Sequence, residues 1–135
     1  MYFARCAVGT FAAGAAVALV VACSDKATAP CQSPNLSGTY SLDSIQVTGQ
    51  GTFTPPGATG TLQLTTTTYV ADLDLPVIGA QHDNGTYSAC SSGTFSQTSA
   101  ISAVTSSGSF TSNALKLTID VTTQGQRFVN FWTKS

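Results

Sequence analysis

Few side chains in this sequence have the types and spacing that chemistry requires. His82 is the only histidine, and Asp83 follows it directly, so a general base oriented by a carboxylate is one hypothesis. The pair adjoins Asn84-Gly85, however, and Asp and Asn are expected beside such a turn for backbone reasons alone. Serines are numerous, but none lies in a Gly-x-Ser-x-Gly motif. We therefore predict no catalytic residues and a protein that is not an enzyme.

The acidic residues suggest one metal hypothesis. Asp72 and Asp74 flank Leu73, and two carboxylates on one strand face could bind Ca²⁺ with oxygens from a neighbouring loop. The other face of this segment is apolar, so a solvent-facing position is the simpler interpretation. The cysteines and the single histidine have no spacing typical of a metal site. We predict neither a metal nor a cofactor.

Composition limits the partners. The 135 residues carry a formal net charge of −1, only 8% are charged, and Glu is absent. So few cations give no electrostatic footprint for nucleic acid. The chain holds 21 Thr and 16 Ser, which must supply its solubility. Thr and Gly with scattered aromatics favour strands and tight turns over helices.

The N-terminal segment has the layout of a secretory signal. Arg5 is the only charge before Asp25, and the 16 residues from Ala7 to Ala22 are uncharged. A transmembrane anchor is the alternative, but it requires about 20 predominantly apolar residues. We predict a signal helix within residues 1–22.

Val20-Val21-Ala22-Cys23, at the end of this segment, resembles the lipobox of bacterial lipoproteins. The resemblance implies cleavage between Ala22 and Cys23 and lipid attachment, including an acyl chain such as palmitate, at Cys23. Ser24 follows where Asp would favour the inner membrane, so it implies the outer membrane. Two or three acyl chains hold a protein on a membrane surface without a spanning helix. A soluble secretion signal is the alternative.

If Cys6 leaves with the signal and Cys23 carries lipid, as the resemblance implies, Cys31 and Cys90 remain. An even pair in an oxidising compartment favours a disulfide. Closing a loop of about 60 residues would contribute about 4 kcal/mol in the chain-entropy model. Two free thiols are the alternative.

The mature chain is predicted to consist of a tether, residues 23–35, and one β domain, residues 36–135. Gly-Thr/Ser-hydrophobe recurs six times, and each copy predicts a strand start with a turn-closing glycine and a core side chain two positions later. The six copies begin at Gly38, Gly51, Gly60, Gly85, Gly93 and Gly108.

Alternation supports several strands. Leu115, Leu117, Ile119 and Val121 share one predicted face, and the apolar phase slips near Asp43, as a β-bulge would cause. Asp83-Asn84-Gly85 is the strongest predicted hairpin turn. Eight or nine strands are expected, near 38–47, 59–66, 68–75, 85–90, 93–99, 100–105, 107–112, 114–122 and 126–133.

Sequential hairpins of short strands predict an antiparallel up-and-down barrel, with a small β-sandwich as the alternative. Leu36–Tyr40 resembles the Gly-x-aromatic opening of lipocalin-like barrels, and Arg127–Lys134 resembles their last strand. The resemblance implies that the last strand pairs with the first. It also places a basic residue, here Arg127, over the first-strand ring, with an ordinary surface cation as the alternative.

Function is expected to be binding. An apolar set either lines a ligand cavity or fills a core: Tyr40, Leu62, Leu64, Tyr87, Phe95, Phe110, Leu117 and Trp132. We predict a cell-envelope lipoprotein that binds a small apolar ligand in or on the barrel. The alternative is a protein-interaction or inhibitor module whose barrel interior is packed.

Overall fold

The computed structural model describes residues 30–76 and 78–135. The predicted signal helix, its cleavage site and Cys23 lie outside the described residues, as does most of the predicted tether. None of the described residues belongs to a helix long and apolar enough to cross a membrane.

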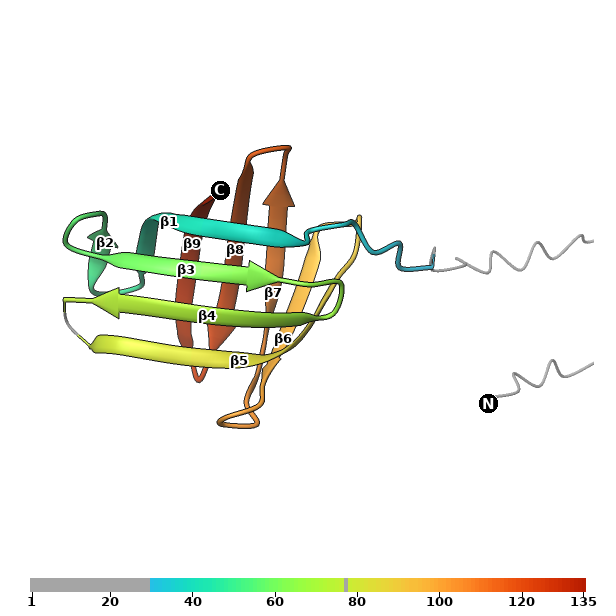
Figure 1. Ribbon diagram of the computed structural model, residues 1–135. Helices are drawn as coiled ribbons and strands as arrows, with labels where there is room; N and C mark the ends of the chain where they lie inside the picture. The colour runs from blue at the N-terminus through green and yellow to red at the C-terminus, as the bar shows by residue number, and fades with distance from the viewer. Residues whose placement is uncertain (1–29, 77) are drawn as a thin grey trace, which may run out of the picture.

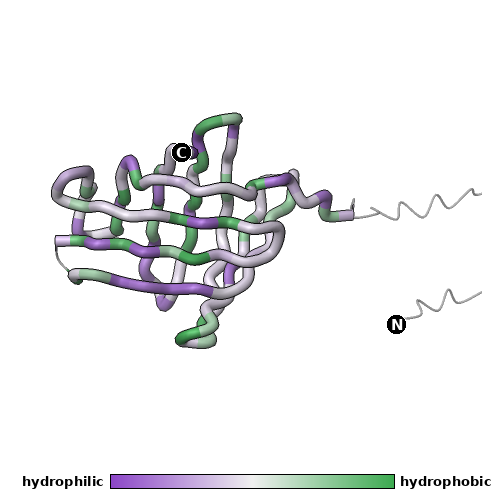
Figure 2. Tube along the Cα trace, viewed as in Figure 1, coloured by the Kyte–Doolittle hydropathy of each residue, from purple (hydrophilic) through white to green (hydrophobic). Residues whose placement is uncertain are grey.

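The described residues form an all-β fold without helix. Hydropathy alternates along several strands, β4 among them, as expected for strands with one buried face, whereas β5 carries a longer hydrophilic stretch (Figure 2). The strands are β1 (Gly38–Val47), β2 (Gly51–Phe53), β3 (Thr59–Leu64), β4 (Thr68–Leu75), β5 (Gly79–Ala89), β6 (Thr94–Ser99), β7 (Thr105–Ser112), β8 (Lys116–Thr123) and β9 (Gln126–Lys134).

The sheet closes on itself. Its order is β2-β1-β3-β4-β5-β6-β7-β8-β9, all neighbours are antiparallel, and β9 also pairs with β1 (Figure 1). Eight strands therefore form a closed up-and-down barrel, and β2 is an extra strand paired only with the end of β1. The barrel prediction is confirmed over the sandwich, and the arrangement is consistent with a lipocalin-like barrel.

A β-bulge bends the first strand, as predicted from the phase slip. The β1–β9 register shifts between Leu42 and Ser44, which leaves Asp43 without a partner in the ladder. The Asp43 carboxylate accepts hydrogen bonds from Thr133 Oγ1 at 2.7 Å and from Lys116 Nζ at 2.9 Å. These bonds join β1, β9 and β8 where the barrel closes.

The Asn84-Gly85 turn was wrongly predicted. Both residues lie inside β5, where Asn84 pairs with Val70 of β4 and Gly85 pairs with Ser99 of β6. Gly85 is needed because a Cβ there would collide with the backbone oxygen of Thr98. The β4–β5 connection instead follows Leu75 and ends at Gly79, whose φ of 71° favours glycine.

Two further expectations were wrong. Residues 100–104 form the connection between β6 and β7 rather than a strand, and β7 is a single strand from Thr105. Leu115 precedes β8 and is 63% exposed, whereas Leu117, Ile119 and Val121 face the interior as expected. Local alternation extended one residue too far because a turn residue happened to be apolar.

Candidate functional site

One end of the barrel, where β1 begins, is covered by the segment that precedes β1; we call it the closed end. Cys31 and Cys90 form the predicted disulfide, with their Cα atoms 5.1 Å apart. Ser91 N donates a 2.8 Å hydrogen bond to the carbonyl oxygen of Gln32. The segment before β1 is thereby fixed to the end of β5.

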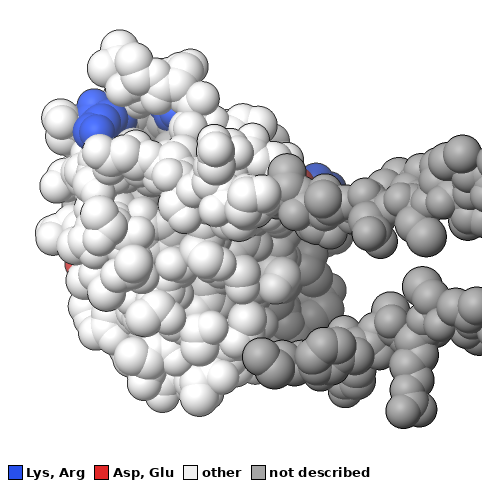
Figure 3. Space-filling model, turned by 90° about the vertical axis from the view of Figure 1, so that its right-hand side faces the viewer, with Lys and Arg blue, Asp and Glu red and all other residues white. Residues whose placement is uncertain are grey.

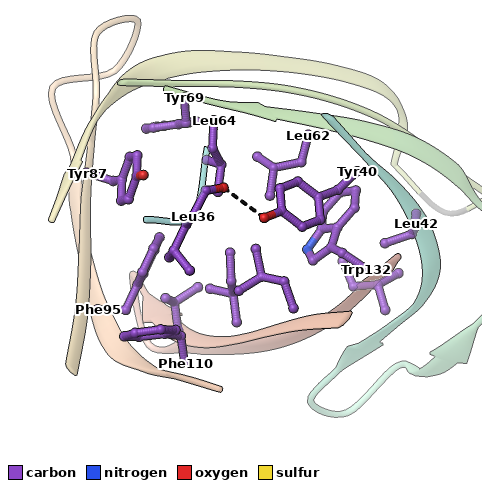
Figure 4. Packing of buried hydrophobic residues seen from close by; sticks show 14 of the residues in the cluster. Leu36, Tyr40, Leu42, Leu62, Leu64, Tyr69, Tyr87, Phe95, Phe110 and Trp132 are labelled. Atoms are coloured by element: carbon purple, nitrogen blue, oxygen red, sulfur yellow. Dashed lines mark hydrogen bonds between the residues drawn. The ribbon is translucent and has the colours of Figure 1, made fainter. Parts of the chain in front are cut away.

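Leu36 is the side chain that fills the closed end. It is buried, and its carbonyl oxygen accepts a 2.8 Å hydrogen bond from the Tyr40 hydroxyl (Figure 4). Burial raises the pKa of Tyr40, so this hydroxyl remains a donor. The rings of Tyr87 and Phe95 stack with centroids 5.8 Å apart, and Phe110 lies 6.3 Å from Phe95. An apolar plug therefore blocks this end.

The basic residue at the first-strand ring is Lys134, not Arg127. Lys134 Nζ lies 5.8 Å from the Tyr40 ring centroid and donates to the carbonyl oxygen of Ser37 at 2.8 Å. Arg127 lies at the far end of β9, where it donates to Asp120 at 2.6 and 2.8 Å. Antiparallel pairing places Lys134, rather than Arg127, opposite Tyr40.

The other end, where β1 finishes, is hollow; we call it the open mouth. Its cavity has a volume of about 310 Å³. Five apolar side chains contribute to it, together with Thr123 and three glutamines: Val47, Phe53, Leu75, Ile78 and Phe128. Ile78 is 49% exposed at this entrance. Its side chain would be available to a ligand that enters the cavity.

A second hollow, the inner cavity, lies within the barrel and has a volume of about 130 Å³. Its apolar lining includes Leu62 and Trp132, but three polar side chains also face it: Asp83, Gln97 and Asn130. Alternation along β5, β6 and β9 turns these three positions inward.

Asp83 is held firmly. Its carboxylate accepts hydrogen bonds from Tyr69 Oη at 2.6 Å, from Ser99 Oγ at 2.5 Å and from Asn84 N at 2.9 Å. Burial, and then the bond to Asp83, raise the pKa of Tyr69 well above its ordinary value. In the sheet, Gly85 pairs with Tyr69 on β4 and with Ser99 on β6. Because glycine has no side chain, it does not obstruct the hydroxyl groups of Tyr69 and Ser99 that reach Asp83.

The two hollows are stacked along the barrel axis. On β4, Leu73 lines the inner cavity and Leu75 lines the mouth. On β8, Val121 lines the inner cavity and Thr123 lines the mouth. Asn130 and Phe128 are the corresponding pair on β9. Successive inward positions on a strand are about 7 Å apart. The inner cavity is thus one layer below the mouth on three separate strands.

The His82–Asp83 hypothesis does not match the geometry, because the two side chains point to opposite faces of β5. His82 lies outside, exposed, with Nδ1 2.6 Å from Asp72 Oδ1. Asp72 and Asp74 both lie on this solvent-facing side, as the simpler interpretation predicted. Among residues 30–76 and 78–135, no three His, Cys, Asp or Glu side chains are grouped as a metal site would require.

All members of the predicted ligand or core set are buried. Most of its members belong to the plug or the walls beside it, and only Leu62 and Trp132 also line the inner cavity. The mouth residues were missed, because Phe53 and Phe128 have the same alternation as any core position. The inward polar residues Gln97 and Asn130 break that alternation and were the available signal.

Charges are sparse around the barrel. Lys and Arg are few, and Asp scarcer still, on the face shown in Figure 3.

The fold defines an eight-stranded up-and-down barrel that is plugged at one end and hollow at the other. No protein-family model matches this sequence, and no curated protein is similar enough to count as a relative.

Proposed function

We propose that this protein is a non-catalytic carrier that binds one small, largely apolar ligand in the open mouth of its barrel. The observation that supports the proposal is the largely apolar cavity of about 310 Å³ that the described residues leave open at one end of a barrel whose other end is plugged. Its volume lies near the lower end of the range of about 300–1,000 Å³ for small-molecule sites. The hollow favours a ligand over the alternative of an interaction module with a packed interior.

Apolar burial would supply the affinity. A ligand that buries about 200 Å² of apolar surface gains about 5 kcal/mol before the entropy of association is subtracted. Weak to moderate affinity and broad tolerance of ligand shape are therefore expected. Catalysis has no place in this proposal, since the single histidine lies on the outer surface.

A binding titration tests the carrier. The full-length protein is titrated with the neutral fluorescent probe N-phenylnaphthylamine, and saturable emission at one probe per chain is expected. Thr123→Trp places an indole in the mouth and should weaken binding about tenfold or more. Thr122→Trp is the matched control, because the neighbouring residue on β8 is exposed and faces outward. No saturable binding by the wild type, or equal loss in both variants, would contradict the proposal.

The proposed address of the carrier is the outer membrane of a bacterial cell envelope, with attachment through lipid on Cys23. Its support is the lipobox resemblance, together with a disulfide compatible with export. Mass spectrometry of membrane-extracted protein should show acyl groups on an N-terminal Cys23. An unmodified Cys23 would refute the anchor and leave the carrier proposal standing.

A further inference from the structure

We infer that Asp83 makes the carrier selective for ligands whose polar head group is a protonated amine. This inference rests on the proposed function, since it names the chemical class of the ligand. The two observations behind it are the position of a carboxylate one layer below the mouth and the absence, among the described residues, of a cation beside it.

The charge of Asp83 is not balanced within the described residues. Asp43 and Asp120 pair with Lys116 and Arg127 on the outside of the barrel. Lys134, the remaining described cation, lies over the closed-end ring. No salt bridge to Asp83 occurs in residues 30–76 and 78–135, and all three of its hydrogen-bond donors are neutral groups.

The remaining acceptor capacity suits one donor. A carboxylate offers about four lone-pair sites, and three hydrogen bonds to Asp83 already occupy most of them. A ligand N–H could complete the set. Because Tyr69 and Ser99 hold both oxygens in place, the carboxylate needs little reorganisation to receive it.

The size of the inner cavity sets the shape of the head group. Its volume of about 130 Å³ suffices for an ammonium group and a short stem. The amides of Gln97 and Asn130 offer further polar contacts at the same level. With the head beside Asp83, an alkyl body would extend through the next layer, about 7 Å away, into the apolar mouth. The inferred ligand is therefore a primary amine with a short hydrocarbon body.

A negatively charged head group should be disfavoured, because Asp83 carries the same sign of charge. A ligand carboxylate or phosphate would approach the half-buried Asp83 carboxylate within the barrel, where repulsion is stronger than in bulk water. Such ligands would have to keep their head groups in solvent and would lose contacts in the mouth. We expect the carrier to prefer an amine over a carboxylate of equal chain length by about tenfold or more.

Displacement of N-phenylnaphthylamine from the full-length protein by octylamine, octanol and octanoate at neutral pH tests the inference. Octylamine is expected to be the strongest competitor and octanoate the weakest. Asp83→Asn should abolish the amine preference while the affinity for octanol stays within about twofold. Asp72→Asn makes the same change on the outer face of the adjacent strand, and it should leave the order unchanged.

The wild type alone supplies a second test, which does not depend on the folding of a variant. Octyltrimethylammonium carries the same charge but has no N–H, so it should compete less well than octylamine. Equal competition by octylamine and octanoate would overturn the selectivity and leave the carrier intact. Equal changes in Asp83→Asn and Asp72→Asn would also overturn it, because net charge alone would then explain the effect. A failure of the probe to bind wild-type protein would instead reject the carrier itself.

Discussion

The two ends of this barrel are built from the same eight strands, yet one is filled and the other is hollow. At the closed end, inward positions carry large rings such as Tyr87, Phe95 and Phe110. At the open mouth, Phe53 and Phe128 are only partly buried against the core. Strand pairing alone therefore does not decide whether a barrel is packed; the segments that cover its ends do.

The cover at the closed end comes from residues before β1. The disulfide holds Cys31 against β5, and Leu36 enters the barrel five residues later. At the mouth, the corresponding extra element is the short strand β2, which continues the sheet from the end of β1. It contributes Phe53 to the rim and leaves the cavity accessible.

The sharpest test of this contrast compares one ring from each end. Phe95→Ala should lower the free energy of unfolding by about 3–5 kcal/mol, because it opens a cavity in a packed cluster. Phe128→Ala should cost about half as much or less, since its ring already borders empty space. Urea unfolding measures both. Equal losses would contradict the claim that packing differs between the ends.

Removal of the disulfide should have the next largest effect. The double variant Cys31→Ala/Cys90→Ala is expected to lose about 2–4 kcal/mol of stability, as the loop it closes becomes free in the unfolded chain. Binding of N-phenylnaphthylamine at the opposite end should change less than about twofold. A strong loss of binding in a folded double variant would mean that the closed end controls the mouth.

Tyr40→Phe sharpens the comparison by removing a single hydroxyl from the plug. The carbonyl oxygen of Leu36 would lose its buried hydrogen bond, and stability should fall by about 1 kcal/mol. Thermal or urea unfolding measures the change. No loss of stability would show that this bond does not help to hold the plug.

The smallest expected effect is a dependence on acid. Hydrogen bonds from Lys116 and Thr133 lower the pKa of Asp43, and the Arg127 hydrogen bond lowers that of Asp120. A lowered folded-state pKa means that the stabilisation is present above the unfolded value of 3.8 and disappears as pH falls through the folded pKa. The urea concentration at the midpoint of unfolding should therefore decrease when the pH is lowered below about 4.

Asp43→Asn should reduce this acid dependence and slightly destabilise the protein at neutral pH. Both ion pairs are largely exposed, so each change should be small. If the stability of Asp43→Asn matched that of the wild type at every pH, the hydrogen bonds of Asp43 at the β1–β9 bulge would not stabilise the closed barrel.

Much of the fold was predictable because it follows from the local alternation of apolar and polar residues. The phase slip at Asp43 located the bulge, and Tyr40 marked the first strand correctly. Asn84-Gly85 misled because a turn preference was overridden by pairing on both sides, where glycine serves close backbone contact. The placement of Asn84 and Gly85 inside a strand depends on the register with β4 and β6, and no local sequence pattern contains that register.

The site was less predictable than the fold. Its aromatic residues alternate as core residues do, so Phe128 and Phe95 are indistinguishable in the sequence. Which of them faces a hollow depends on what covers each end, and that is a tertiary property. Asp83 was noticed for its neighbour His82, but strand geometry separates the two side chains and gives Asp83 a different setting.

The most direct measurement is a map of where a ligand binds. The full-length ¹⁵N-labelled protein is titrated with N-phenylnaphthylamine, and backbone amide shifts are followed residue by residue. Saturable shifts are predicted around the mouth, at Val47, Phe53, Leu75 and Phe128, with Leu36, Phe95 and Phe110 unchanged. Shifts centred on the closed end, or none that saturate, would contradict a barrel plugged at one end and open to a ligand at the other.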